Sequence, residues 1–335
     1  MKEGNYLSKT VTVQILAGVF AMLIIVSGAG AQSVDVALCH VANPGNAPDP
    51  STGFGKVDYE YSIGKFDVTE DQYVAFLNAV AKADKYRLYS PMMAKAGNGG
   101  PSDEDYHTGA GIIRSGTSGN YSYSVIGNSG NAPVTFVTWF NAARFCNWLH
   151  NGQPTDPKDA ESSTETGAYT LNGDKTRGNE TKDPGAKWWI PSENEWYKAA
   201  YYDPELNGGK GGYWRYATQS NTTPGNVIGS GSNQVNGIVN GSFSVKIRRY
   251  SHDSLLTPVG VFTNSASYYG AYDQAGNVAQ WNDALISGKR GIRGAPCSAF
   301  TFEMSSATHS YAPPSTVGMY MGFRVATFRQ AVSSK

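Results

Sequence analysis

The apolar residues that follow Thr69 recur at the spacing of an amphipathic helix. Four of them share one face of that helix: Tyr73, Phe76, Leu77 and Val80. Thr69 and Gln72 match the pattern of a capping box, in which each side chain bonds the backbone N–H of the other residue. The pattern predicts a helix that begins after Thr69 and buries its apolar face.

Two further segments combine a cap with an apolar face. Thr138 is the expected cap of the first, Asn151-Gly152 supplies its stop, and its apolar positions are Ala142, Phe145, Cys146 and Leu149. In the second, Ser192 and Glu195 match another capping box, and Asp203-Pro204 is the expected end. Its buried stripe is Trp196, Ala199 and Ala200. Capping explains Ser192 and Glu195, so we assign them no catalytic role.

The rest of the chain alternates short β-rich pieces with long polar connections. The expected strands lie within residues 59–66, 134–137, 188–190, 292–293 and 322–327. Segments rich in Gly, Asn, Ser and Thr cover residues 97–132, 151–188 and 205–247. Three helices, short strands and long connections predict one loop-rich α+β domain.

The longest apolar run, Val11 to Val26, lies near the N-terminus. Lys2 and Lys9 precede it, and the small residues Ala29-Gly30-Ala31 follow as a cleavage motif. This pattern predicts a secretory signal peptide at residues 1–31, and an uncleaved membrane anchor is the alternative. We therefore expect a secreted or periplasmic product with no membrane attachment after cleavage.

The charge balance narrows the range of partners. The 335 residues include 27 Lys and Arg against 27 Asp and Glu, so no net positive field draws nucleic acid to the chain. The three cysteines, Cys39, Cys146 and Cys297, cannot all pair within one molecule. The sequence shows none of the common nucleophile, phosphate-loop or zinc-protease motifs, and its histidines lack the spacing of a metal site.

A set of short sequence motifs in a fixed order says most about the fold and the family of this chain. They lie at residues 63–69, 133–139, 146–149, 189–200, 273–281, 293–294 and 322–326. In this order they resemble the formylglycine-generating enzyme family, also called the sulfatase-modifying-factor domain family. The resemblance runs from Tyr59 to Ala326 and implies a single domain of the C-type-lectin-like type. Large apolar anchors of such a fold would be Trp139, Trp148, Trp196, Trp281 and Phe323.

The resemblance also divides the chain. We expect a signal peptide at residues 1–31, an N-terminal extension at 32–58, a sulfatase-modifying-factor-like domain at 59–327 and a tail at 328–335.

The family's enzymes resemble copper-dependent oxidases that convert a sulfatase cysteine to formylglycine with two cysteines after an Arg-Gly-Gly-Ser phrase. Here the phrase reads Arg293-Gly294-Ala295-Pro296-Cys297, and counting forward without gaps places the two cysteine positions at Ala299 and Met304. Neither side chain supplies the thiolate that copper(I) prefers. We therefore expect copper not to bind. An oxidase with a rearranged site, in which Cys297 is a displaced ligand beside Met304, remains the alternative.

A second departure concerns calcium. The family phrase Gly-Asn-Val-Trp-Glu-Trp appears here as residues 276–281 with Gln280 in place of the Glu, which the resemblance identifies as a calcium ligand. A site built from Asn277, the Val278 carbonyl and Gln280 would have lost a negative charge, and calcium affinity depends on the charge of the ligands. We expect such a site to be weak or empty.

The segment 295–320 is rich in small hydroxyl and aromatic residues, which suit adaptable contacts with a ligand. Its position resembles the variable face of retroelement-diversified proteins of the same fold. The candidate ligand-binding residues are Trp281, Cys297, Met304 and His309. The sequence therefore predicts an exported module that binds a protein, peptide or glycan. The alternatives are the rearranged oxidase and a structural surface protein.

Overall fold

The computed structural model describes residues 33–94, 111–245 and 254–328. The predicted signal peptide at 1–31 and residues 329–335 of the predicted tail lie outside these ranges. Within the ranges described, no helix combines the length and the apolar character needed to cross a bilayer.

The three predicted helices are confirmed, with the caps that the sequence indicates. They are α1 (Glu70–Val80), α2 (Trp139–His150) and α4 (Glu193–Tyr201). Both capping boxes form: the Gln72 side chain accepts from the Thr69 N–H at 3.0 Å, and that of Glu195 accepts from the Ser192 N–H at 2.6 Å. Two short helices lie in the polar connections, α3 (Pro157–Ala160) and α5 (Leu206–Gly209).

Among the described residues, the strands form two four-stranded sheets and three hairpins. The first sheet is antiparallel, in the order β1 (Leu38–Val41), β2 (Tyr61–Gly64), β14 (Ala326–Thr327) and β5 (Trp188–Trp189). The second has the order β12 (Ser310–Ala312), β11 (Lys289–Arg293), β10 (Ala279–Ile286) and β13 (Met321–Phe323), with β10 and β13 parallel. The hairpins are β3 (Ile112–Ser115) with β4 (Ser122–Val125), β6 (Tyr202–Asp203) with β7 (Gly212–Tyr213), and β8 (Ile238–Val239) with β9 (Ser242–Phe243).

Two expectations about the strands and helices need correction. No strand forms at 134–137, because Phe136 has a positive φ of 56° that interrupts the extended backbone. The helix α4 ends at Tyr201 and not at Asp203, because Tyr202 and Asp203 pair with β7.

The domain also begins earlier than expected. The sequence suggested residues 32–58 as an extension, but the described part of this segment, 33–58, supplies β1 to the first sheet. Val41 and Val57 of this segment are buried in the main core. The segment is therefore an integral part of the fold.

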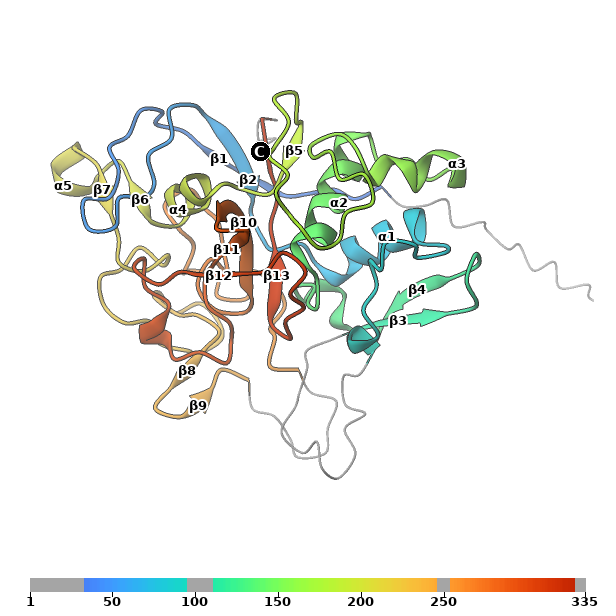
Figure 1. The fold of residues 1–335 in the computed structure, drawn as a ribbon. Helices are drawn as coiled ribbons and strands as arrows, with labels where there is room; N and C mark the ends of the chain where they lie inside the picture. Colours follow the sequence, from blue (N-terminus) through green and yellow to red (C-terminus); the bar gives the residue numbers. More distant parts are fainter. Residues whose placement is uncertain (1–32, 95–110, 246–253, 329–335) are drawn as a thin grey trace, which may run out of the picture. The chain divides into compact units, whose positions relative to one another are not determined.

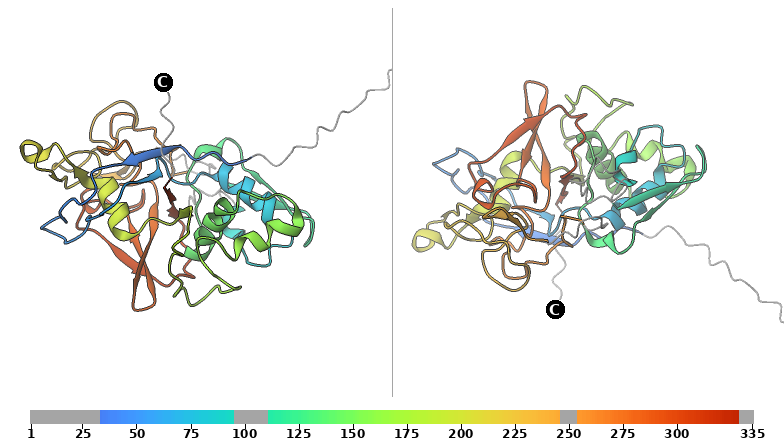
Figure 2. Two further views of the ribbon diagram at one scale, coloured as in Figure 1. Left: turned by 90° about the horizontal axis from the view of Figure 1, so that it is seen from above. Right: turned by 90° about the horizontal axis from the view of Figure 1, so that it is seen from below.

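The main core lies where α1 and α2 meet the two sheets (Figure 1). Figures 1 and 2 show α1, α2 and the β3–β4 hairpin gathered on one side, with α4 and the second sheet on the other. Phe145 of α2 contacts Phe76 of α1 and Phe323 of β13, with ring centroids 5.3 and 5.4 Å apart. Each such aromatic pair adds about 0.5–1.5 kcal/mol beyond the burial of its area. The five predicted anchors are all buried: Trp139, Trp148, Trp196, Trp281 and Phe323.

A buried carboxyl group at the start of α1 makes stability depend on pH. Glu70 is buried, and the Ser129 hydroxyl donates to its Oε2 at 2.5 Å. Burial raises the pKa of Glu70 from 4.5 to about 8. The folded protein thus holds a proton that the unfolded chain releases near pH 4.5, so the free energy of unfolding falls as the pH rises through this window.

We expect Glu70→Gln to remove this contribution, because the amide keeps the shape of the side chain and does not titrate. Between pH 4.5 and about 8, the unfolding free energy of the variant should fall less steeply than that of the parent protein. The difference in slope should approach about 1.4 kcal/mol per pH unit. Urea denaturation across this range measures it, and parallel curves would contradict the assignment.

Candidate functional site

The structure does not bring the four predicted ligand-binding residues into one cavity. Trp281 lies in β10 within the main core, is fully buried, and donates from Nε1 to the Val137 carbonyl at 3.0 Å. Cys297 and Met304 are also buried, each in a different small apolar cluster. These three side chains offer no surface to a ligand, whereas His309 is exposed.

The Cys297 thiol packs among apolar side chains: Ala132, Leu255, Leu256 and Val278. Burial raises its pKa to about 12, so the thiol stays protonated at neutral pH. Met304 packs instead in the cluster of Trp196 and Val235. The two sulfur atoms therefore belong to separate packing environments, and neither is poised for chemistry.

Arg293, the cation nearest to Cys297 in the sequence, is directed elsewhere. Its Nε donates to Glu193 Oε1 at 2.5 Å, and its Nη1 donates to the carbonyls of Ser306 and Thr308 at 2.6 and 2.9 Å. Asn282 completes the cluster by donating to Glu193 Oε2 at 2.7 Å. This buried ion pair therefore anchors the loop that precedes His309.

The segment that follows Cys297 carries an exposed aromatic pair. Phe300 and Phe302 are 43% and 56% exposed, and their rings stack with centroids 5.4 Å apart and planes 15° apart. Thr301 between them is buried. The loop thus turns two large apolar side chains outward.

A polar cleft of about 490 Å³ lies beside the same segment. Ser305, Ser306 and Ala307 form one wall. The others come from distant parts of the chain, namely Asp49, Ser51, Tyr213, Trp214, Arg215 and Asn221. Hydrogen bonds fix part of this lining: Trp214 Nε1 donates to Asp203 at 3.0 Å, and the Tyr197 hydroxyl donates to Asp49 at 2.6 Å.

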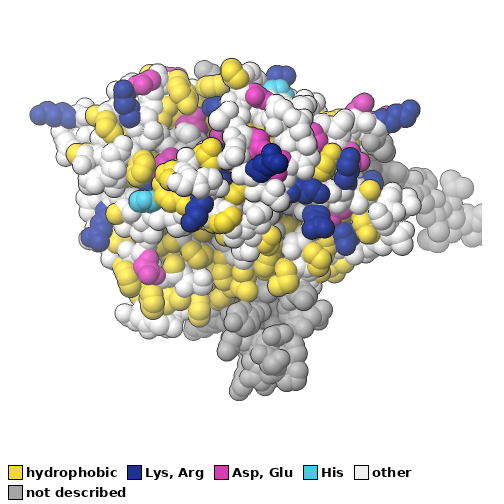
Figure 3. All heavy atoms as spheres, viewed as in Figure 1, with side chains coloured by type: hydrophobic (Ala, Val, Ile, Leu, Met, Phe, Trp, Pro, Cys, Tyr) yellow, Lys and Arg dark blue, Asp and Glu magenta, His cyan; other side chains and the backbone are white. Residues whose placement is uncertain are grey.

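His309 lies on an aromatic surface next to this loop. Its ring contacts Phe54 and Tyr311 edge-on, with centroids 5.8 and 5.5 Å apart. Figure 3 shows one face of the molecule, with hydrophobic side chains gathered over the region of β8 and β9 (labelled in Figure 1). Exposed aromatic groups, a polar cleft and a histidine therefore occur along one stretch of chain, residues 300–309.

The sequence matches the family described as the sulfatase-modifying factor enzyme 1-like domain over residues 12–328. The chain belongs to this family. The solved structure of CarF has 21% identity and a TM-score of 0.51, with 88% of this chain and 99% of that chain covered. Treponema denticola variable protein 1 has 18% identity and a TM-score of 0.50, with coverage of 90% and 98%. No curated protein matches.

These findings confirm the family and the fold predicted from the ordered phrases. The domain is a mixed α+β fold of the C-type-lectin-like type, with few helices and short strands. At these levels of identity, the two solved structures establish the likeness of fold alone.

Within the sulfatase-modifying-factor family, this member lacks thiol donors for copper at the two positions where the resemblance expects them. Ala299 and Met304 occupy the positions where the resemblance places the two thiols. The buried, protonated Cys297 packs in a different cluster from Met304, so the two do not form a replacement pair. The residues present do not fit copper(I), which needs converging soft ligands.

The predicted calcium ligands are likewise committed to other partners. Gln280 Oε1 accepts from Trp196 Nε1 at 2.7 Å and from Arg324 Nε at 2.6 Å. Asn277 Oδ1 accepts from the Asn236 side chain and the Thr257 N–H at 3.0 and 3.1 Å. Each amide oxygen has two lone pairs, so neither has one left for a cation. With a guanidinium beside Gln280, the Val278 carbonyl alone does not make a calcium site.

The sequence did not single out the lining of the cleft, because its residues are far apart along the chain. Asp49, Trp214 and Ser305 meet only through tertiary packing. The aromatic pair left no clear signal in the sequence. Phe300 and Phe302 are two residues apart, and the short 3-10 helix Thr301–Glu303 that contains Phe302 was not predicted.

Proposed function

We propose that this chain is an exported, non-oxidase member of the sulfatase-modifying-factor family that binds a ligand with residues 295–320. The observation that carries the proposal is the exposed, stacked pair Phe300 and Phe302 on that segment. Large aromatic side chains lose little conformational entropy on binding and contribute much of the energy at binding surfaces.

The surroundings of the pair support a protein or peptide ligand. Phe300 bridges to Ile238 of β8, which pairs with Phe243 of β9. Asn226 bonds the carbonyls of Gly237 and Ser242 in the same hairpin. Phe243 therefore lies one strand away from Phe300, and the exposed Val227 and Ile228 directly follow Asn226. We define the apolar patch as Val227, Ile228, Phe243, Phe300 and Phe302. Exposed apolar patches mark interaction sites.

The cleft at residues 305–307 supplies hydrogen-bonding groups, which the apolar patch lacks. Arg215, Asn221 and Ser305 offer hydrogen-bonding groups at its walls. An apolar centre next to polar groups is the usual composition of a protein interface, in which the polar groups fix the orientation of the partner. Aliphatic members of the patch, such as Val227 and Ile228, favour the apolar side chains of a peptide over a glycan.

Peptide and glycan arrays probed with the purified mature protein test this proposal. We expect peptide hits with apolar side chains, and we expect Phe300→Ala and Phe302→Ala each to weaken them by about tenfold or more. Ile113→Ala is the matched control, because Ile113 is 41% exposed on β3, outside residues 295–320. Hits that ignore both Phe substitutions, glycan hits alone, or no hits at all would contradict the proposal.

A further inference from the structure

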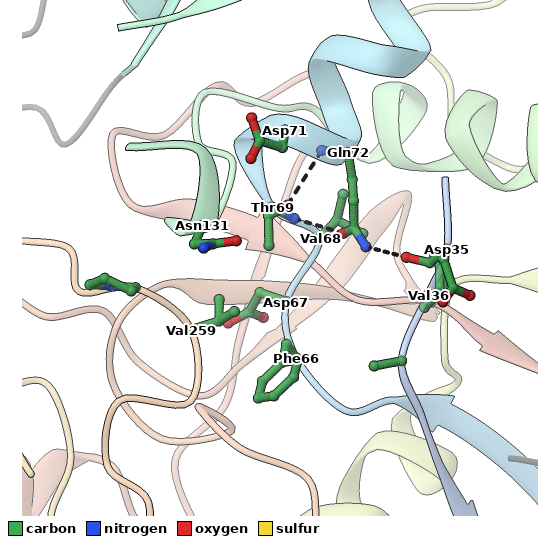
Figure 4. A pocket seen from close by; sticks show the side chains of 13 residues that line it. Asp35, Val36, Phe66, Asp67, Val68, Thr69, Asp71, Gln72, Asn131 and Val259 are labelled. Carbon is green, nitrogen blue, oxygen red and sulfur yellow. Dashed lines mark hydrogen bonds between the residues drawn. The ribbon is translucent and has the colours of Figure 1, made fainter. Parts of the chain in front are cut away.

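A second cavity, separate from the 295–320 surface, opens beside the start of α1. Its volume is about 450 Å³. Figure 4 shows side chains that line it, among them Asp35, Asp67, Asp71 and Phe66. Asp35 and Asp71 are exposed, whereas Asp67 is only 1% exposed. The cavity thus has carboxylates both at its mouth and in its buried wall.

One oxygen of the buried carboxylate has no partner. Asp67 Oδ2 makes no hydrogen bond to any residue that the structure describes. Oδ1 meets only Arg324 Nη2, at 3.4 Å. Buried polar atoms are rarely left unpaired, so an oxygen of this kind in a cavity wall indicates a missing partner.

Arg324 does not bond this oxygen, because its hydrogen bonds go to Asp67 Oδ1 and to three other acceptors. Its Nε donates to Gln280 Oε1, its Nη1 to the Gly64 carbonyl at 2.9 Å, and its Nη2 to the Tyr272 carbonyl at 2.8 Å. Its charge is also divided between two acids, since it interacts with both Asp67 and the buried Asp273. Two buried carboxyl groups therefore face one guanidinium.

Other nearby charges do not close this imbalance. Asp273 Oδ2 accepts from the Gly260 N–H at 2.7 Å, and burial raises the pKa of this carboxyl group to about 6. Lys65 lies over the rings of Phe66 and Tyr272, 5.6 Å from each centroid. Burial raises the pKa of Asp67, so its carboxyl group is stabilised by taking up a proton or by pairing with a cation.

The walls indicate what kind of cation fits. Among the described residues, no three His, Cys, Asp or Glu side chains converge as metal ligands would. The cavity is larger than an ion requires, and Val36, Phe66 and Val259 give it apolar sides. An organic cation with a methylene chain matches both features, because the chain packs on apolar walls while its charged end meets a carboxylate.

We propose that this cavity binds an alkyl ammonium group, with the ammonium donating to Asp67 Oδ2 and the methylene chain packed against Val36, Phe66 and Val259. Asp35 and Asp71 at the mouth receive a second ammonium when the ligand is a diamine. The same chemistry is offered by a free diamine and by a lysine side chain of a peptide.

Calorimetric titration of the mature protein with 1,4-diaminobutane, butylammonium and N-acetyl-lysine methylamide tests the proposal, and 1,4-butanediol is the uncharged control. We expect the amines to bind and the diol not to bind. Asp67→Asn should weaken amine binding by about tenfold or more, because the neutral amide no longer attracts the ammonium. Diaminobutane binding tighter than that of the lysine derivative assigns a free diamine, and the reverse order assigns a peptide side chain.

Asp71→Asn gives a second test that does not depend on a buried residue. This substitution of an exposed residue should weaken the binding of diaminobutane more than that of butylammonium. It tests the proposed amine site even if Asp67→Asn fails to fold. Phe300→Ala should leave amine binding unchanged, so this site and the 295–320 surface can fail independently. The proposal is overturned if no amine binds, if the diol binds equally well, or if a folded Asp67→Asn protein binds amines as the parent does.

Discussion

Trp281→Ala is expected to lower the free energy of unfolding by about 3–5 kcal/mol, the usual cost of truncating a buried aromatic residue. Trp281 is fully buried in the main core, and the substitution also removes the N–H that satisfies the Val137 carbonyl. Urea denaturation, followed by circular dichroism, measures the loss. Trp281→Phe is the control: it keeps most of the ring and should cost less than the alanine variant.

This result would separate packing from binding at a position where the sequence suggested a ligand contact. Loss of binding in Trp281→Ala would then reflect a destabilised fold. The opposite outcome is also informative: a Trp281→Ala protein with parental stability and no ligand binding would show that Trp281 contacts the ligand.

Arg293→Met is expected to destabilise the protein by about 3–5 kcal/mol, because it leaves a buried carboxylate without its cation. Arg293 is buried and bonds Glu193 Oε1 at 2.5 Å. The substitution also frees the carbonyls of Ser306 and Thr308, which Arg293 holds. We therefore expect faster amide hydrogen exchange in residues 303–310, together with a lower urea midpoint.

The double variant Glu193→Gln, Arg293→Met is the control for this prediction. Removing the unpaired charge should recover part of the stability that Arg293→Met loses, because the larger cost comes from the isolated anion. If the double variant is less stable than the single one by the full cost of Glu193→Gln alone, the two residues act independently and the account of this ion pair is wrong.

Local features of the fold could be predicted from the sequence, and features that depend on distant contacts could not. Caps and apolar periodicity located α1, α2 and α4, because a cap acts within one turn of its helix. The longest strand, β10, was missed because polar residues interrupt its apolar pattern. Asn282 is tolerated there because its side chain bonds Glu193, which is far away along the chain. Asp283 is tolerated because Arg290, across the hairpin, bonds its carboxylate.

The same distinction explains the candidate site. The resemblance suggested a ligand-binding surface at 295–320, and of the four residues selected with it, the fold buries Trp281, Cys297 and Met304. A sequence pattern cannot show that Phe300 and Phe302 face solvent while Thr301 faces inward, because this depends on how the loop packs on β8. Similarly, nothing in the sequence distinguishes Asp67, and only the structure shows that it lines a cavity with one oxygen unpaired.

We propose that the family scaffold here serves binding and not oxidation of a cysteine. The most direct test incubates the purified mature protein with copper(I), oxygen and a sulfatase-type cysteine peptide, and follows the peptide by mass spectrometry. We predict that the peptide keeps its thiol and forms no aldehyde, since residues 299 and 304 provide no thiolates. Aldehyde formation that disappears in Cys297→Ser would contradict the claim.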